Sequence, residues 1–164
     1  MVEHVGPMYL RLSRAATLSV HDGDVEVSIG KGMTLKEGSD VTLVAAGAMV
    51  GRCMLAAEKL EKKDLSTRVL NMPCVKPLDN DLVLKAARET GALVTAEENT
   101  TIGGLGGAVA ELLGEEYPTP MKRIGIKDTF ALTAPDPESL MDAFGMSVDD
   151  IVAAAEAVLK NKVK

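Results

Sequence analysis

The stretch LVTAEENTTIGGLGG at residues 93–107 constrains the fold more than any other part of this sequence. A short apolar run ends in two carboxylates, a polar turn follows, and a glycine cluster leads directly into the helical pattern AVAELL. Glycines at the start of a helix allow other parts of the backbone to approach closely. A buried strand, a loop and a glycine-led helix make up the strand–helix unit of an α/β domain. In an open parallel sheet, such a loop lies at the carboxyl edge, where functional surfaces gather.

The composition is that of a globular domain of ordinary size. The chain has 164 residues, of which 46% are hydrophobic and 26% are charged. Its apolar runs fall well short of the roughly 20 residues that span a bilayer. The net charge of -6 disfavours nucleic acid or an anionic membrane surface as the main partner. Cys53 and Cys74 are too few for a disulfide framework, so we expect reduced thiols in a cytoplasmic protein.

Hydrophobic periodicity predicts strands that alternate with helices. Strands are expected at residues 8–13, 25–29, 41–46, 66–72, 93–96 and 123–126. Helices are expected at residues 49–62, at 79–91, from the glycine cluster to residue 113, and at 147–159. Asp79 and Ser147 suit N-cap positions, and Gly91 suits the residue that follows a helix.

This alternation predicts a three-layer α/β/α domain around a mostly parallel five-stranded sheet. Residues 30–38 are expected to turn the chain, and this loop is too short for a crossover helix. The strand at residues 25–29 is therefore expected to be the one antiparallel edge strand. Residues 15–24 are rather polar and lack a helical pattern, so we expect a linker there.

A series of segments resembles the carboxyl-terminal part of the transketolases. In chain order they are GPMYLRLSR at residues 6–14, VLNM and VKPLD within 69–79, ETGALVTAEE at 89–98, IGGLG at 102–106 and RIGIKDTF at 123–130. Together they extend over nearly the whole chain. The short motifs KPLD at residues 76–79 and AEE at residues 96–98 favour the shorter, split or archaeal-like type of transketolase. After Phe130 the sequence ALTAP departs from the small, glycine-rich turn that the family tends to show.

The resemblance implies a domain organisation and an activity. Residues 1–14 would end a pyrimidine-binding domain, residues 15–24 would be a linker, and residues 25–164 would form a transketolase C-terminal domain. The parent enzyme would transfer a two-carbon ketol unit between phosphorylated sugars, with thiamine diphosphate and Mg²⁺ as cofactors. The chain has no Gly-Asp-Gly with a downstream Asn to hold the metal and the diphosphate, so no cofactor is expected in this chain.

We therefore expect a fragment of a longer polypeptide, with a natural stand-alone domain as the alternative. Its partners would be the remaining transketolase domains or an N-terminal subunit, in a parent enzyme that is a homodimer. Its role would be to stabilise that dimer and to line the substrate channel, and it would be catalytically inert alone. No catalytic residue and no metal ligand is expected in the chain.

Two arginines have a specific functional interpretation. By the resemblance, Arg14 would contact the phosphate of the sugar phosphate, with Arg11 beside it, because a guanidinium fork matches phosphate oxygens. The alternative is that both are surface arginines near a chain end.

The glycine cluster has two interpretations. Backbone N–H groups at Gly103, Gly104, Gly106 and Gly107 would suit an anion at the start of the helix. The pattern is not a GxGxxG fingerprint, however, because Val109 stands where the third glycine would be. We favour the second interpretation, which is close packing against the sheet or against a partner subunit.

The two carboxylates next to the glycine cluster are unsuited to act together. Glu97 and Glu98 are adjacent on a strand and point to opposite faces, so they do not form an acid–base pair on one atom. We expect one of them to cap or pair within the loop and the other to be solvated.

Two other functions stay open at this point. One is a stand-alone module that binds a phosphorylated ligand or a nucleotide at the glycine-led helix. The other is the C-terminal domain of a 2-oxoacid dehydrogenase beta subunit, which would dock a partner acyltransferase.

Overall fold

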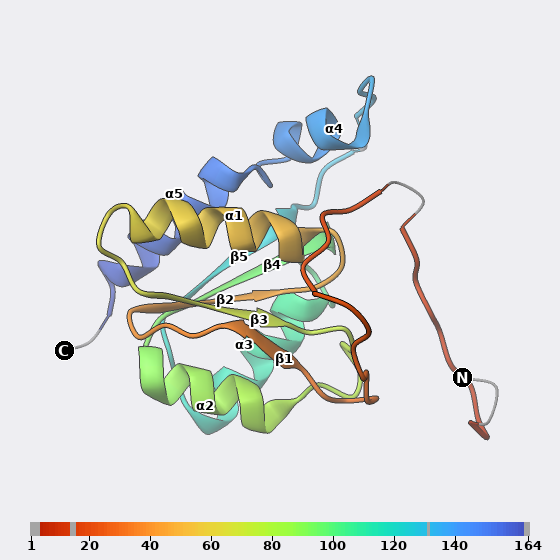
Figure 1. Ribbon diagram of the computed structural model, residues 1–164, viewed down its shortest axis with the longest axis horizontal. Coiled ribbons are helices and arrows are strands. Elements are labelled where there is room, and N and C mark those ends of the chain that lie inside the picture. Colours follow the sequence, from red (N-terminus) through yellow and green to blue (C-terminus); the bar gives the residue numbers. More distant parts are fainter. Residues whose placement is uncertain (1–3, 14–15, 131, 163–164) are drawn as a thin grey trace.

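Among residues 4–13, 16–130 and 132–162, which the computed structural model describes, five strands form one sheet in the order β1-β3-β2-β4-β5 (Figure 1). The strands are Met33–Lys36 (β1), Val41–Ala45 (β2), Thr67–Asn71 (β3), Leu93–Thr100 (β4) and Met121–Ile126 (β5). β2 pairs in parallel with β3 and β4, and β4 pairs in parallel with β5. β1 pairs antiparallel with β3. The predicted mostly parallel sheet with one antiparallel edge strand is confirmed.

Helices cover both faces of the sheet, as the three-layer prediction requires (Figure 1). The helices are Met49–Glu61 (α1), Asn80–Thr90 (α2), Leu105–Glu116 (α3), Pro137–Ala143 (α4) and Val148–Leu159 (α5). Helices α1 and α5 pack on one face, while α2 and α3 pack on the other. Helix α4 buries none of its residues and stands beyond the carboxyl end of the sheet.

Local capping fixes the ends of two helices as the sequence predicted. The Asp79 side chain accepts a hydrogen bond from the Leu82 N–H at the start of α2. Gly91 ends that helix in the left-handed region, with a φ of 63°. Ser147 and Asp150 form a capping box at the start of α5. Each cap satisfies a backbone group that the helix itself cannot pair.

The central strand β2 holds the two halves of the core together. All five of its residues are buried, because helices cover it on both sides. Leu43 faces the cluster under α1 and α5, and Val44 faces the cluster under α2 and α3. The one hydroxyl on this strand, at Thr42, shares a hydrogen bond of 2.8 Å with the Thr90 hydroxyl. No buried polar side chain is left unpaired on β2.

The edge strand is not where the sequence placed it. The prediction of a strand at residues 25–29 is wrong, and the residues expected to turn instead contain β1. Before β1, a turn closed by the Lys31 N–H donating to the Ser28 carbonyl redirects the chain, and Gly30 adopts a φ of 77°. Only the chain after this turn reaches the edge of β3.

The strand expected at residues 8–13 is not formed in this structure. These residues lie in an exposed arm, residues 4–13, which extends outside the sheet (Figure 1). Within the described part of the chain, the arm pairs with no strand. A sequence of alternating apolar residues forms a strand only where a neighbouring strand supplies the hydrogen bonds.

Two further differences concern element lengths near the carboxyl edge. β4 continues beyond residue 96 to Thr100, so Glu97 and Glu98 belong to the strand. β5 begins two residues earlier than expected, at Met121. The pairing of β4 with β5 breaks register between Ala96 and Thr100, which bends the end of β4.

We predict that Gly38→Ala destabilises the fold. A methyl group at Gly38 would lie 2.2 Å from the Thr67 carbonyl carbon, so the β1–β2 turn must separate from β3. The expected loss in the free energy of unfolding is about 1–3 kcal/mol, measured by urea denaturation. The matched control is Gly114→Ala in α3, where a methyl group meets nothing within 4 Å. This control is expected to gain about 0.5–1 kcal/mol, and equal losses in both variants would contradict the prediction.

Candidate functional site

The start of α3 is built around the carboxylate of Glu97. One oxygen, Oε2, accepts a hydrogen bond of 2.9 Å from the Leu105 N–H, and Oε1 accepts one of 2.8 Å from the Gly106 N–H. The residue is only 5% exposed. A helix start leaves N–H groups unpaired and carries partial positive charge. The N–H groups donate hydrogen bonds to a buried carboxylate, and the positive charge stabilises its negative charge. Glu97 is therefore the internal cap that the sequence led us to expect of one of the two carboxylates.

The glycines at this turn make room for the carboxylate. A methyl group at Gly104 would lie 1.9 Å from Glu97 Oε2. At Gly106 it would lie 2.8 Å from Thr95 Oγ1 and 3.0 Å from Arg123 Cδ. A side chain at Gly104 would displace the Glu97 carboxylate, and one at Gly106 would require Thr95 or Arg123 to move.

The other two glycines of the cluster have different surroundings. A methyl group added at Gly103 or at Gly107 would meet nothing within 4 Å, and Gly103 has a φ of 72° that favours glycine. The N–H groups of Leu105 and Gly106 already bond to Glu97. Of the four glycine N–H groups expected to suit an anion, that of Gly106 is therefore taken by this carboxylate.

Glu98 points to the opposite face of β4, where its surroundings are partly exposed to solvent. Its side chain is 30% exposed, and Oε1 lies 3.5 Å from Arg11 Nη2. The Arg11 side chain is 52% exposed, so this pair adds little to stability. Arg14, the expected phosphate contact, lies outside the described residues.

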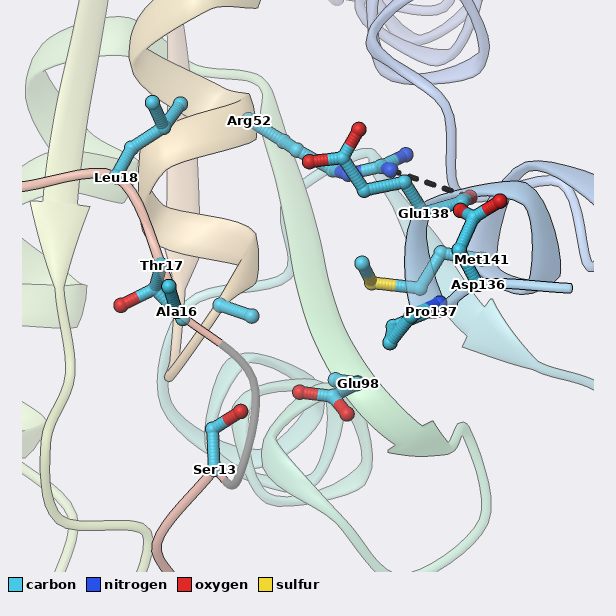
Figure 2. A pocket seen from close by; sticks show the side chains of 11 residues that line it. Ser13, Ala16, Thr17, Leu18, Arg52, Glu98, Asp136, Pro137, Glu138 and Met141 are labelled. Atoms are coloured by element: carbon cyan, nitrogen blue, oxygen red, sulfur yellow. Dashed lines mark hydrogen bonds between the residues drawn. The ribbon is translucent and has the colours of Figure 1, made fainter.

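A cavity of about 390 Å³ lies next to Glu98 (Figure 2). It opens between the ends of β2 and β4, where α1 leaves toward one face of the sheet and α3 toward the other. Crevices at such points are the usual ligand sites of open α/β sheets. Its wall comes from an N-terminal segment, the start of α1, the end of β4 and the start of α4, and the lining residues are Ser13, Ala16, Thr17, Leu18, Ala48, Arg52, Glu98, Asp136, Pro137, Glu138 and Met141.

Sequence reasoning missed Arg52 in the wall of this cavity. Its side chain is 12% exposed and forms an ion pair with Asp142. The guanidinium also donates to the Met146 carbonyl at 3.0 Å and to the Glu138 carbonyl at 3.3 Å. The only available signal was an arginine inside the apolar helical pattern of residues 49–62. That signal does not indicate its partners, which lie 86 to 94 residues away.

Among the described residues, Cys53 and Asp136 have pKa values displaced by their surroundings. Burial raises the pKa of the Cys53 thiol to about 12. Hydrogen bonds from the Ser139 N–H and hydroxyl lower the pKa of Asp136, which lies at the cavity wall. Cys74 is partly exposed.

Neither a metal centre nor a membrane-spanning helix is found in the part of the chain that the structure describes. No group of three or more His, Cys, Asp or Glu side chains in these residues could hold a metal ion. Nor is any helix formed by these residues long and apolar enough to cross a membrane.

The strand order, the helices on both faces and the crevice between β2 and β4 define a doubly wound α/β domain. Comparison with known families gives its identity more closely. Residues 30–151 match the model of the family described as "Transketolase, C-terminal domain". The chain belongs to this family, which confirms the resemblance seen in its sequence.

Several relatives are similar to the chain along nearly all of its length. It is 42% identical over 162 residues to the 6-deoxy-6-sulfo-D-fructose transketolase subunit SqwH of Clostridium sp. (strain MSTE9), covering 99% of this chain and 50% of the relative. It is 42% identical over 165 residues to 1-deoxy-D-xylulose-5-phosphate synthase 1 of Geobacter sulfurreducens, covering 98% of this chain and 26% of the relative.

A solved structure has the same fold at a similar level of identity. The structure, described as "Split gene transketolase, inactive beta4 tetramer", has 43% sequence identity and a TM-score of 0.84. The match covers 92% of this chain and 48% of that one. This chain thus spans about half the length, or less, of the relatives it matches.

We predict that Glu97 and Glu98 differ sharply in their contribution to stability. Glu97→Ala leaves the buried N–H groups of Leu105 and Gly106 without a partner, and should lower the free energy of unfolding by about 1–3 kcal/mol. Glu98→Ala removes only a partly exposed ion pair and should cost less than about 1 kcal/mol. Urea denaturation of both variants measures the difference. A loss from Glu98→Ala as large as that from Glu97→Ala would contradict this prediction.

We also predict that the two thiols react differently in the folded protein. At pH 8 a thiol with a pKa of about 12 is almost entirely protonated, and Cys53 is fully buried. Iodoacetamide should therefore modify Cys74 alone, and both thiols should react in denaturant. Mass spectrometry after brief labelling measures this, and native labelling of Cys53 at the Cys74 rate would refute it.

Proposed function

We propose that this chain is the C-terminal section of a thiamine-diphosphate-dependent transketolase, which transfers two-carbon ketol units between phosphorylated sugars. The observation that carries the proposal is the family membership, together with the share of its relatives that the chain spans. The subunit SqwH and the split-gene transketolase each extend over about twice the length of their match to this chain. The chain would act with the remaining sections of such an enzyme.

The distribution of exposed apolar side chains supports an assembly. Among the described residues, the large exposed apolar side chains fall mainly in the N-terminal segment before β1 and in the loops after β3, β4 and β5, which lie at the carboxyl edge of the sheet. Leu55 and Tyr117 are the exceptions in that set. The members of these segments with more than half of their surface exposed are Val5, Tyr9, Leu10, Leu12, Leu18, Val27, Ile29, Ile102, Phe130 and Leu132. A concentration of this kind marks a protein interface.

The arm of residues 4–13 supports the proposed domain organisation. It carries alternating apolar residues and finds no strand to pair with among the described residues. In our proposal residues 1–14 complete the sheet of a preceding pyrimidine-binding domain, residues 15–24 are the linker, and residues 25–164 form the C-terminal domain. The arm would become a strand once that preceding sheet is present.

The cofactor would be held elsewhere in the assembly. Thiamine diphosphate needs a divalent metal with oxygen ligands, and the described residues of this chain offer no suitable donor group. In our proposal, ketol transfer takes place in the sections of the enzyme that hold the cofactor. Its proposed roles are stabilisation of the parent dimer and lining of the substrate channel, with Arg14 as the substrate contact and Arg11 beside it.

Ketol transfer by the purified chain, with and without its partner section, tests this proposal. The chain alone, supplied with thiamine diphosphate, Mg²⁺, xylulose 5-phosphate and ribose 5-phosphate, is expected to show no transfer. Addition of the thiamine-diphosphate-binding section of the same enzyme should produce both a complex and activity. Transfer by the chain alone would overturn the proposal.

A matched pair of variants examines the interface itself. Phe130 is 95% exposed at the carboxyl edge, so Phe130→Ser should weaken the complex about tenfold without changing the fold of the isolated chain. Leu55→Ser, at a 40% exposed position on α1, is the control and should bind as the unmodified chain does. Equal binding by both variants would place the interface elsewhere.

Calorimetry and a pull-down distinguish the two other candidate functions. Micromolar binding of ATP or ribose 5-phosphate to the isolated chain would favour a stand-alone binding module. Specific capture of an acyltransferase would favour the 2-oxoacid dehydrogenase branch.

A further inference from the structure

A segment of the expected linker is seated on helix α1. The strap, residues 16–22, crosses α1 where Gly51 leaves a gap in the helix surface. A methyl group at Gly51 would lie 2.8 Å from Leu18 Cβ and 3.1 Å from Leu18 Cδ1. The three atoms nearest to such a methyl group all belong to Leu18. The absence of a side chain at Gly51 therefore makes room for Leu18 of the strap and not for a core residue.

Two further contacts hold the strap against the domain. Val20 packs against the core cluster under α1 and α5, and it lies on the same side as Leu18 in an extended chain. The Asn71 side-chain amide donates to His21 Nε2 at 3.3 Å, which ties the end of the strap to the end of β3. Leu18 itself remains 58% exposed, so the strap lies on the surface and is not part of the core.

The next residue of α1 holds a second outer segment. Arg52 donates to the Glu138 carbonyl in the first turn of α4 and pairs with Asp142 in its last turn. It also donates to the Met146 carbonyl after that helix. Helix α4 has no buried residue of its own, and only partly buried Met141 in it packs against the core. Arg52 is therefore the main polar connection of α4 to the domain.

The strap and α4 form opposite walls of the carboxyl-edge cavity. Thr17 and Leu18 line it from the strap, and Pro137 and Met141 line it from the α4 side, as Figure 2 shows. A second hollow of about 290 Å³ lies along the other side of the strap, against Met54 and Leu55. The strap is thus loosely packed on both flanks, and its anchors determine its position.

We propose that the adjacent residues Gly51 and Arg52 of α1 are two independent anchors for two detachable covers of this cavity. Gly51 seats the strap through Leu18, and Arg52 holds α4. Each cover detaches without the other and without loss of the sheet, because neither contributes a fully buried side chain to the core.

Backbone order parameters from ¹⁵N relaxation of the whole chain test the two anchors. In the unmodified chain, residues 17–21 and 137–143 are expected to have values near the roughly 0.85 of rigid backbone. Gly51→Leu fills the gap on α1 and should lower the order parameters of the strap below about 0.6. The order parameters of α4 and of the sheet should stay unchanged. Arg52→Met should loosen α4 in the same way and leave the strap ordered.

Matched controls separate these effects from general damage to a helix. Gly114→Leu makes the same change in α3, where an added methyl group would meet nothing within 4 Å, and should leave both covers ordered. Arg88→Met removes an arginine from α2 that lies over the Tyr117 ring, far in sequence from either cover. It too should leave both covers ordered.

Leu18→Ala keeps the proposal testable if Gly51→Leu fails to fold. It removes the side chain over Gly51 and leaves α1 intact, so the strap should again loosen alone. Three results would overturn the proposal. The strap could be disordered in the unmodified chain, it could stay ordered in both Gly51→Leu and Leu18→Ala, or either anchor variant could loosen both covers together.

Discussion

The carboxyl edge of this domain depends on one buried interaction, in which the Glu97 carboxylate accepts hydrogen bonds from two N–H groups at the start of α3. A buried carboxylate is costly without donors, and a buried helix start is costly without acceptors, so each satisfies the other. The contact requires glycine at position 104, because any side chain there would collide with the carboxylate. It also fixes the direction of β4, which turns Glu98 toward the cavity on the opposite face.

The domain combines a closed core with surfaces that the chain does not cover. β2 is buried on both sides, and the helices α1, α2, α3 and α5 complete the two halves of the core. Outside it, the strap and α4 are held by neighbouring residues of α1, and the arm reaches away from the sheet (Figure 1). The apolar side chains of the carboxyl edge lie among these outer segments. A domain of this construction suits a section of a larger assembly, which agrees with the length of its relatives.

Much of the fold was predictable because it is encoded by residues close together in the sequence. The buried runs of β2 to β4 and the periodic patterns of α1 and α5 appear in single segments, as do the caps at Asp79, Gly91 and Ser147. The two adjacent carboxylates also indicated that one of them would cap the following turn, and Glu97 does so. The edge strand was misplaced because residues 25–29 alternate more strongly than β1 does, whereas only β1 reaches the open side of β3.

The class of fold, the family and the carboxylate cap of the β4–α3 turn were thus predictable from residues close together in the chain. The segments that meet around the cavity were not, because they are distant in the sequence. Arg52 finds its partners 86 to 94 residues away, and Gly51 finds Leu18 across the strap. Helix periods and caps arise from neighbouring residues, which is why a single segment indicates them. The contacts of the cavity wall instead arise once the sheet has fixed the distances between distant parts of the chain.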